Sequence, residues 1–412
     1  MARWSTLAAM MLVLGGVIVA GHRYLWARLI RDAGVGSVDQ RVWILVLTAL
    51  AVGIPLAVVM GRLVPPALST WWLTPVYYWL GVSALLVLAV AAVDLGQALF
   101  ALIGNGQSGG ESVDPERRRA FARVGAVAAL VMAVPTSAWA AVEGRRLRVK
   151  RVEVPLAKLP AALDGFRIVQ LTDVHLGPTV GRTFIERMVA MVNELSPDLI
   201  AITGDLVDAS VEDLREDVAP LAKLTSKHGA YFVTGNHEYH ADAPRWCEHL
   251  GQLGVRVLRN ECVSIERGGS VIHLAGVDDF EAAGSGVGHG MDLNRALEGR
   301  DHRPPLVLLA HQPKAVHEAS RLGVDLQLSG HTHGGQLWPL GWFHRLTQPV
   351  VAGLAKFGKT WLYVSCGTGH SGPPMRLAAP AEISEIILRV VSPTAVDPAP
   401  AGHPQAEKSH AS

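Results

Sequence analysis

The sequence predicts an α/β domain preceded by four membrane-spanning helices, and two observations predict this division. Four long apolar runs occupy the first third of the 412-residue chain. From about residue 151, short apolar runs bounded by Gly, Asp or Pro alternate with amphipathic stretches. We therefore expect a membrane region over 1–145, an α/β domain over 151–392, and a disordered tail over 393–412 with few residues to bury.

The apolar runs have the length of membrane spans. They cover 4–21, 43–60, 76–103 and 124–141, each near the ~20 residues that a helix needs to cross a bilayer. Aromatic residues such as Trp71, Trp72 and Tyr77 gather near their ends, where amphipathic rings favour the headgroup zone. We expect a multi-pass protein of the cell membrane.

Arginine is concentrated in two of the loops between these runs. The first loop carries Arg23, Arg28, Arg31 and Arg41, the third carries Arg117, Arg118, Arg119 and Arg123, and the second has only Arg62. Since positive loops stay in the cytoplasm, the α/β domain is expected on the extracytoplasmic side. One feature opposes this topology, because Arg145, Arg146, Arg148, Lys150 and Arg151 directly follow the fourth run.

The fourth run has two interpretations. Arg118-Arg119 precede an apolar stretch ending in Ala138-Trp139-Ala140, which resembles a twin-arginine export signal with a small-residue cleavage site. The same arginines are equally consistent with ordinary positive charge beside a membrane helix. Both interpretations leave the α/β domain outside.

Composition excludes two other classes of function. Lys+Arg 37 against Asp+Glu 36 gives a net charge of +1, so no nucleic-acid partner is expected. The three cysteines lack the CxxC spacing of a thiolate zinc site and fit small buried residues. A mean hydropathy of +0.27 instead favours lipid as the partner.

Periodicity predicts the elements of the α/β domain. The expected strands are 166–171, 199–203, 230–234, 271–275, 306–310, 324–328, 362–365 and 383–390. One face of 183–195 is apolar, which predicts a helix packed on the sheet.

Polar side chains follow five of these strands. They are Asp173, His175, Asp205, Asn236, His237, Glu238, His311, His331 and His333. Ligands bind outside the carboxyl ends of strands in open α/β sheets, so these groups are expected to converge. Oxygen and imidazole donors without thiolate suit Mn, Fe or Zn. Two Asp, one Asn and four His among these residues make seven donors, a number that suits two ions sharing a carboxylate.

The ordered series Asp173-x-His175, Gly204-Asp205, Gly235-Asn236-His237-Glu238, His311 and Gly330-His331-x-His333 resembles the five-block signature of the calcineurin-like metallophosphoesterases. The resemblance covers about 154–389 and implies a four-layer αββα sandwich. The segments Gly334-Gly335-Gln336, Ser371-Gly372-Pro373-Pro374 and Pro380-Ala381-Glu382-Ile383 resemble its bacterial membrane-anchored or twin-arginine-exported branch.

The resemblance also implies the ligands of two divalent ions, with Mn favoured. Asp173, His175, Asp205 and His333 would hold the first ion, and Asp205, Asn236, His311 and His331 the second. A hydroxide between the ions would attack phosphorus. His237 would donate a proton to the leaving oxygen or stabilise the transition state; the alternative is that it orients Asp173.

Other polar residues receive structural interpretations. Glu238 is expected to support its loop, and Asp278 and Asp279 to be solvated turn carboxylates. His370 and Arg376 lie in a late Gly-rich segment from which they could reach a substrate phosphate.

Three functions follow from these observations. The first is an outward-facing, membrane-anchored phosphoesterase that hydrolyses a phosphodiester or pyrophosphate of a lipid- or envelope-linked substrate. The second is a pyrophosphatase of the UDP-diacylglucosamine type on the cytoplasmic face, which requires the opposite topology. The third is a membrane receptor whose phosphoesterase-like domain only binds.

Overall fold

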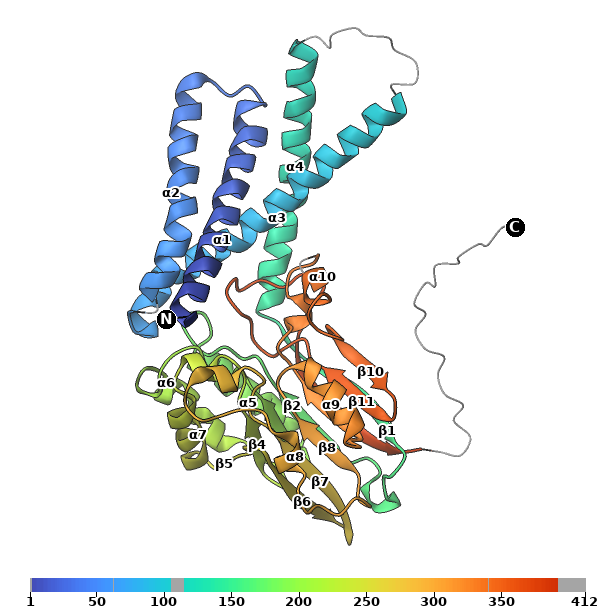
Figure 1. Ribbon diagram of the computed structural model, residues 1–412. Helices are drawn as coiled ribbons and strands as arrows, with labels where there is room; N and C mark the ends of the chain where they lie inside the picture. The colour runs from blue at the N-terminus through green and yellow to red at the C-terminus, as the bar shows by residue number, and fades with distance from the viewer. Residues whose placement is uncertain (1, 62, 105–114, 340, 392–412) are drawn as a thin grey trace, which may run out of the picture.

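Four long helices form one end of the molecule and an α/β domain forms the other (Figure 1). The computed structural model describes residues 2–61, 63–104, 115–339 and 341–391, with the side chains of 2–12, 104 and 115 left out. The expected tail over 393–412 lies outside this part of the chain. The long helices are α1 (Ala2–Trp26), α2 (Ser37–Gly61), α3 (Pro66–Gly104) and α4 (Pro115–Gly144).

Three of these helices are long and apolar enough to cross a membrane. They are Ser37–Gly61, Pro66–Ile103 and Glu116–Gly144, with mean hydropathies of 2.6, 2.2 and 1.7. Large apolar side chains stand open on their surfaces, and Phe100 is 75% exposed. Such surfaces are unusual for a protein in water and fit lipid. The first expected span, 4–21, lies in α1, but half of its side chains, those of 4–12, fall outside the described residues.

The turn between α1 and α2 and the start of α4, which carries Arg117, Arg118 and Arg119, lie at the end of the helical region that is remote from the α/β domain (Figure 1). A short π-helical turn, Ala27–Arg31, follows α1 there. Arg123 of α4 donates from Nε to the carbonyl of Ala33 at 2.8 Å, which ties the start of α4 to the turn between α1 and α2. The start of α4 and the turn between α1 and α2 are therefore neighbours.

The α/β domain contains two six-stranded sheets. The first has the order β1-β12-β2-β3-β4-β5 and the second β10-β11-β9-β8-β7-β6. Strands β2, β3, β4 and β5 are parallel to one another, as are β7, β8, β9 and β11. The strands are β1 (Leu147–Leu156), β2 (Arg167–Leu171), β3 (Leu199–Thr203), β4 (Ala230–Val233), β5 (Val255–Val257), β6 (Glu261–Arg267), β7 (Ser270–Gly276), β8 (Leu306–Leu309), β9 (Leu326–Ser329), β10 (Gly353–Phe357), β11 (Thr360–Val364) and β12 (Ala381–Val390).

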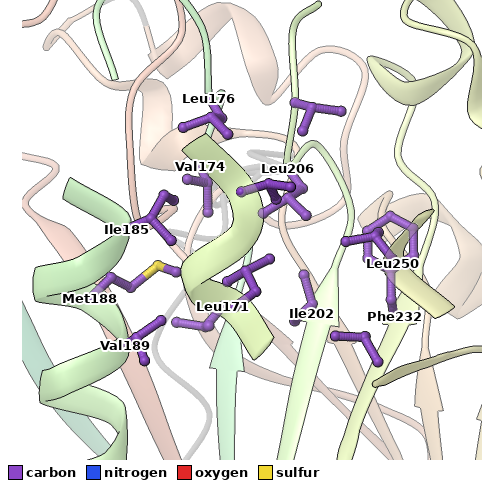
Figure 2. Close-up of a cluster of buried hydrophobic side chains, with 14 of the residues drawn as sticks. Leu171, Val174, Leu176, Ile185, Met188, Val189, Ile202, Leu206, Phe232 and Leu250 are labelled. Atoms are coloured by element: carbon purple, nitrogen blue, oxygen red, sulfur yellow. The ribbon is translucent and has the colours of Figure 1, made fainter. Parts of the chain in front are cut away.

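Helices cover the outer faces of the sheets, which gives the four-layer sandwich that the resemblance implies. They are α5 (Arg182–Glu194), α6 (Val211–Val218), α7 (Ala243–Gln252), α8 (Leu293–Ala296) and α9 (Val316–Arg321). The short helix α10 (Gly341–His344) has no buried residue. Figure 2 shows one core layer, where Ile185 and Met188 of α5 face Leu171 and Ile202 of the first sheet. A second cluster, including Phe166 and Tyr363, fills the space between the sheets.

All eight expected strands are present, with ends shifted by no more than two residues, and the expected helix 183–195 corresponds to α5. Four strands were not anticipated, namely β1, β5, β6 and β10. Strand β1 begins at Leu147 and contains part of the basic cluster that follows α4. Its Lys150 and Arg151 pair with Glu382 and Glu385 of β12, at 3.2 and 2.6 Å. These cations therefore belong to the folded domain.

The helices and the α/β domain pack together around the loop that carries Met375 and Arg376. Met375 lies in an apolar cluster with Leu337, Leu85 of α3 and Ala140 of α4. The backbone N–H of Arg376 donates to the carbonyl of Ala140 at 2.9 Å. Gly81 allows this approach, because a Cβ there would lie 2.5 Å from the Met375 sulfur.

Candidate metal centre

The polar residues singled out in the sequence follow the carboxyl ends of β2, β3, β4, β8 and β9. The structure brings them together where the two sheets meet. All are buried except Asn236, His237 and His331, which are half-buried. Convergence of the strand ends is therefore observed.

Several of these residues adopt a backbone conformation that L-amino acids avoid. The φ angles of Asp173, His175, Asp205, His331 and His333 are 53°, 53°, 51°, 72° and 51°. Such angles cost free energy and persist only where surrounding contacts enforce them. Here the N–H of Asp173 donates to the Gly204 carbonyl at 3.0 Å, and that of His175 donates to the Asp205 carbonyl at 3.1 Å. Strain concentrated in this way is typical of a functional site.

One group of donors surrounds His175 and His333. Their Nε2 atoms lie 2.9 Å apart. Nε2 of His333 lies 3.5 Å from Asp173 Oδ1, and Nε2 of His175 lies 3.9 Å from Asp205 Oδ2. These are the four residues assigned to the first ion by the resemblance.

A second group lies on the other side of Asp205. Nε2 of His311 is 3.1 Å from Asp205 Oδ2, and Nδ1 of His331 is 3.0 Å from Asn236 Oδ1. His311 donates from Nδ1 to the carbonyl of Thr203 at 2.8 Å, which leaves its Nε2 with a free lone pair. Asp205 is thus shared by both groups.

These residues fit divalent cations. Within the described residues, Nε2 of His311 is buried and makes no hydrogen bond, although buried polar atoms are nearly always satisfied. A cation would satisfy it together with the carboxylate beside it. The donors are carboxylate, carboxamide and imidazole, and no thiol takes part, which suits Mn, Fe or Zn.

Glu238 supports the loops that carry these donors, as expected. Its carboxylate accepts the backbone N–H of Asp205 at 3.0 Å, of Leu206 at 2.7 Å and of Gly235 at 2.6 Å. Burial, followed by the nearby charge of Asp205, raises the pKa of Glu238 to about 7. The side chain therefore ties the end of β3 to the end of β4.

Asp208 is a site residue that the sequence reasoning missed. Its Oδ1 accepts hydrogen bonds from Nδ1 of His175 and Nδ1 of His237, both at 2.8 Å. Carboxylates that bind metal-ligating histidines from behind fix the ring and its tautomer. The available signal was its spacing, three residues after Asp205.

His237 lies at the open edge of the site, with a side chain 32% exposed. Its ring contacts Asp208 rather than Asp173, and its backbone N–H donates to Asp205 Oδ1 at 2.8 Å. Burial opposes protonation, but Asp205 and Asp208 outweigh it and raise the pKa of His237 to about 9.

Two expectations about other polar residues were wrong. Asp278 and Asp279 are each 1% exposed rather than solvated; Asp278 binds the Arg259 guanidinium through two bonds of 2.9 Å. Arg376 is fully buried, and its guanidinium donates to backbone carbonyls, including those of Cys366 and Ala379 at 2.8 and 2.7 Å. It holds a loop together and does not face a substrate.

Comparisons with known proteins agree with this site. The family described as calcineurin-like phosphoesterase matches residues 166–335. A transmembrane protein with metallophosphoesterase domain from Danio rerio is 38% identical over 394 residues, covering 92% of this chain and 89% of that protein.

Two further relatives match a little over half of the chain. A Bos taurus protein with the same description is 48% identical over 252 residues, or 58% of this chain and 57% of that protein. An uncharacterized metallophosphoesterase of Helicobacter pylori is 39% identical over 245 residues, or 59% of this chain and 64% of that protein. The chain belongs to the calcineurin-like phosphoesterase family and is a metal-dependent phosphoester hydrolase.

Proposed function

We propose that the chain is a membrane-anchored, two-metal phosphoesterase that hydrolyses phosphodiester or pyrophosphate bonds of a lipid- or envelope-linked substrate. The observation that carries the proposal is the pair of donor groups on either side of Asp205. A single carboxylate between two sets of imidazole and oxygen donors is the arrangement that two neighbouring cations require.

The donor chemistry supports two ligand sets that meet at Asp205. Asp173, His175, Asp205 and His333 would hold one ion, and Asp205, Asn236, His311 and His331 the other. When bound, the ions, with Mn favoured, would supply acidity to a water molecule and neutralise charge on the phosphoryl oxygens.

His237 would supply the proton that the leaving oxygen needs. Asp208 holds the His237 ring through Nδ1, which leaves Nε2 for a substrate oxygen. The partial exposure of the His237 ring supports contact with a substrate. In contrast, the proposed metal ligands His175, His311 and His333 are buried. General acid help of this kind is a usual role of imidazole near neutral pH.

We further propose an extracytoplasmic catalytic domain on a multi-pass anchor. The turn between α1 and α2 and the arginine-rich start of α4 lie at the end of the helices remote from this domain, which agrees with the positive-inside tendency (Figure 1). The opposing cations after α4 weigh less than their number indicates, because Arg148, Lys150 and Arg151 pair with Glu143, Glu382 and Glu385.

The cytoplasmic pyrophosphatase is a second candidate, and Arg145 and Arg146 beside α4 favour it. Reporters fused after Val391 separate the two topologies. An active alkaline phosphatase fusion together with a green fluorescent protein fusion that does not fluoresce would support the outward domain. The reverse pattern would support the cytoplasmic enzyme.

The activity is tested with the full chain in detergent. After removal of metal by a chelator, Mn should restore hydrolysis of p-nitrophenyl phosphate or bis-p-nitrophenyl phosphate. Asp205→Asn should remove both bound metals and nearly all activity. Asp325→Asn is the matched control, since Asp325 is a buried carboxylate, 9% exposed, that directly precedes β9 at the amino ends of the parallel strands of the second sheet. A folded, metal-loaded chain without turnover on any phosphoester would favour the receptor.

A further inference from the structure

A cluster of large apolar side chains stands exposed beside the metal centre. Trp338, Trp342, Phe343 and Leu346 are 57%, 63%, 69% and 81% exposed, and we call these four residues the apolar lip. Elsewhere in the described part of the α/β domain, exposed apolar residues are scattered and less open, as with Phe280 at 47% and Val390 at 39%. Exposed apolar surface of this density marks a binding surface.

The lip begins where the α/β domain meets the long helices. Leu337 packs in the cluster that contains Leu85 of α3 and Ala140 of α4. The backbone N–H of Trp338 donates to the carbonyl of Leu377 at 3.0 Å, in the loop whose Arg376 contacts α4. Helix α10 carries Trp342 and Phe343, and Trp342 lines the same hollow as Leu377 of that loop.

This location puts the lip at the level where the apolar helices end. Arg145, which directly follows α4, donates to the hydroxyl of Tyr78 on α3 at 3.0 Å. Trp139 in the last turns of α4 is 57% exposed. Tryptophan and arginine at the end of a membrane helix, as at the end of α4, are typical of the boundary between hydrocarbon and water. The lip offers two more tryptophans beside that boundary.

The lip also adjoins the metal donors. A hollow of about 220 Å³ is lined by Trp338, Trp342, Arg345 and Gly334, and Gly334 directly follows the metal donor His333. The apolar rings would suit hydrocarbon, and the guanidinium of Arg345 would suit a phosphate or other anionic headgroup. The hollow therefore places apolar rings and a guanidinium beside the residue that follows a metal donor.

We propose that the apolar lip lies in the headgroup region of the bilayer that holds the long helices, and that the substrate is an amphiphile drawn from that bilayer. The first half of this inference concerns lipid contact alone. The second half rests on the phosphoesterase activity proposed above and narrows its substrate to a phosphoester with an apolar chain.

Lipid contact is tested without reference to activity. The full chain with Cys247→Ser and Cys262→Ser carries a nitroxide at Phe343→Cys, or at Val390→Cys as the control, in vesicles of phosphatidylcholine and phosphatidylglycerol. We expect the ratio of oxygen to nickel-chelate accessibility to be at least about threefold higher at 343 than at 390. Equal ratios would overturn the proposal. Shielding of 343 from both reagents would also overturn it and indicate a second protein chain.

The substrate class is tested with matched esters. The chain is assayed on the phosphodiester phosphatidylglycerol in vesicles and on its deacylated counterpart glycerophosphoglycerol in solution, and the ratio of the two kcat/KM values is measured. Trp342→Ser/Phe343→Ser/Leu346→Ser should lower this ratio at least about tenfold, whereas Val390→Ser/Val391→Ser should not change it. An unchanged ratio in the triple variant would overturn the inference. Absence of metal-dependent turnover on every ester, with 343 in lipid, would instead remove the proposed function.

Discussion

The two ends of the parallel strands both carry buried carboxylates, but those carboxylates have different partners. At the amino ends, Asp198 accepts from Lys227 at 2.8 Å, from Arg267 at 3.1 Å and from the Arg167 backbone N–H at 2.8 Å. At the carboxyl ends, Asp173 and Asp205 lie among imidazoles, and no lysine or arginine pairs with them in the described part of the chain. Lysine and arginine side chains therefore neutralise the buried carboxylate only at the amino ends of the strands.

This difference separates structural carboxylates from functional ones. Burying an ionised carboxylate is unfavourable unless cations or N–H groups compensate it. Asp198 has that compensation in the fold itself, so its role is complete without a ligand. Asp205 takes part of its compensation from imidazoles that also have free lone pairs, which makes the carboxyl ends receptive to external cations.

The sharpest test of the comparison is His237→Ala. Loss of general acid help should slow turnover by ~10²–10⁴. Both metals should stay bound, because the His237 ring belongs to neither donor group. Metal content by mass spectrometry, measured beside kcat, separates the two effects. If the variant lost metal in proportion to activity, His237 would be a supporting residue for the ligands.

Asp208→Asn should have a smaller effect. The substitution keeps the shape of the side chain but removes the charge behind His175 and His237, and such partners are typically worth ~10–100-fold in metal affinity or activity. A titration of Mn against activity should show weaker binding. Unchanged affinity and turnover would mean that the carboxylate does not tune the site.

Asp198→Asn should leave kcat within about twofold. It should instead lower the free energy of unfolding by about 2 kcal/mol, because Lys227 and Arg267 lose the negative charge that they bind. Burial acts to raise the pKa of Asp198, but hydrogen bonds from Lys227 and the Arg167 backbone outweigh it and hold this pKa below its usual range. Its stabilising contribution is therefore present above about pH 4 and is lost as the pH falls through the lower folded-state pKa. Urea unfolding should show wild type and variant converging in acid; a constant difference would contradict this.

The sequence was sufficient for the elements that carry the site. Strong apolar runs that end in Asp, Asn or His identified β2, β3, β4, β8 and β9, because buried parallel strands have a simple pattern. Their side chains could be expected to converge because carboxyl ends of parallel strands share an edge.

Other features depend on contacts between distant residues, which a local pattern does not contain. Strand β1 is rich in basic residues and becomes a strand through pairing with β12 across more than two hundred residues. Asp278 is buried because Arg259 reaches it, and Arg376 because backbone carbonyls surround it. Asp208 gains its role only when His175 and His237 meet on the same oxygen.

The loop around Arg376 has a mechanical consequence. Its guanidinium holds Cys366 and Ala379, while its backbone N–H holds α4 at Ala140. The catalytic domain is thus braced against its anchor instead of swinging on a tether. This contact would hold the metal centre at a fixed distance from the bilayer. The enzyme would then select phosphates that lie at that distance from the membrane surface.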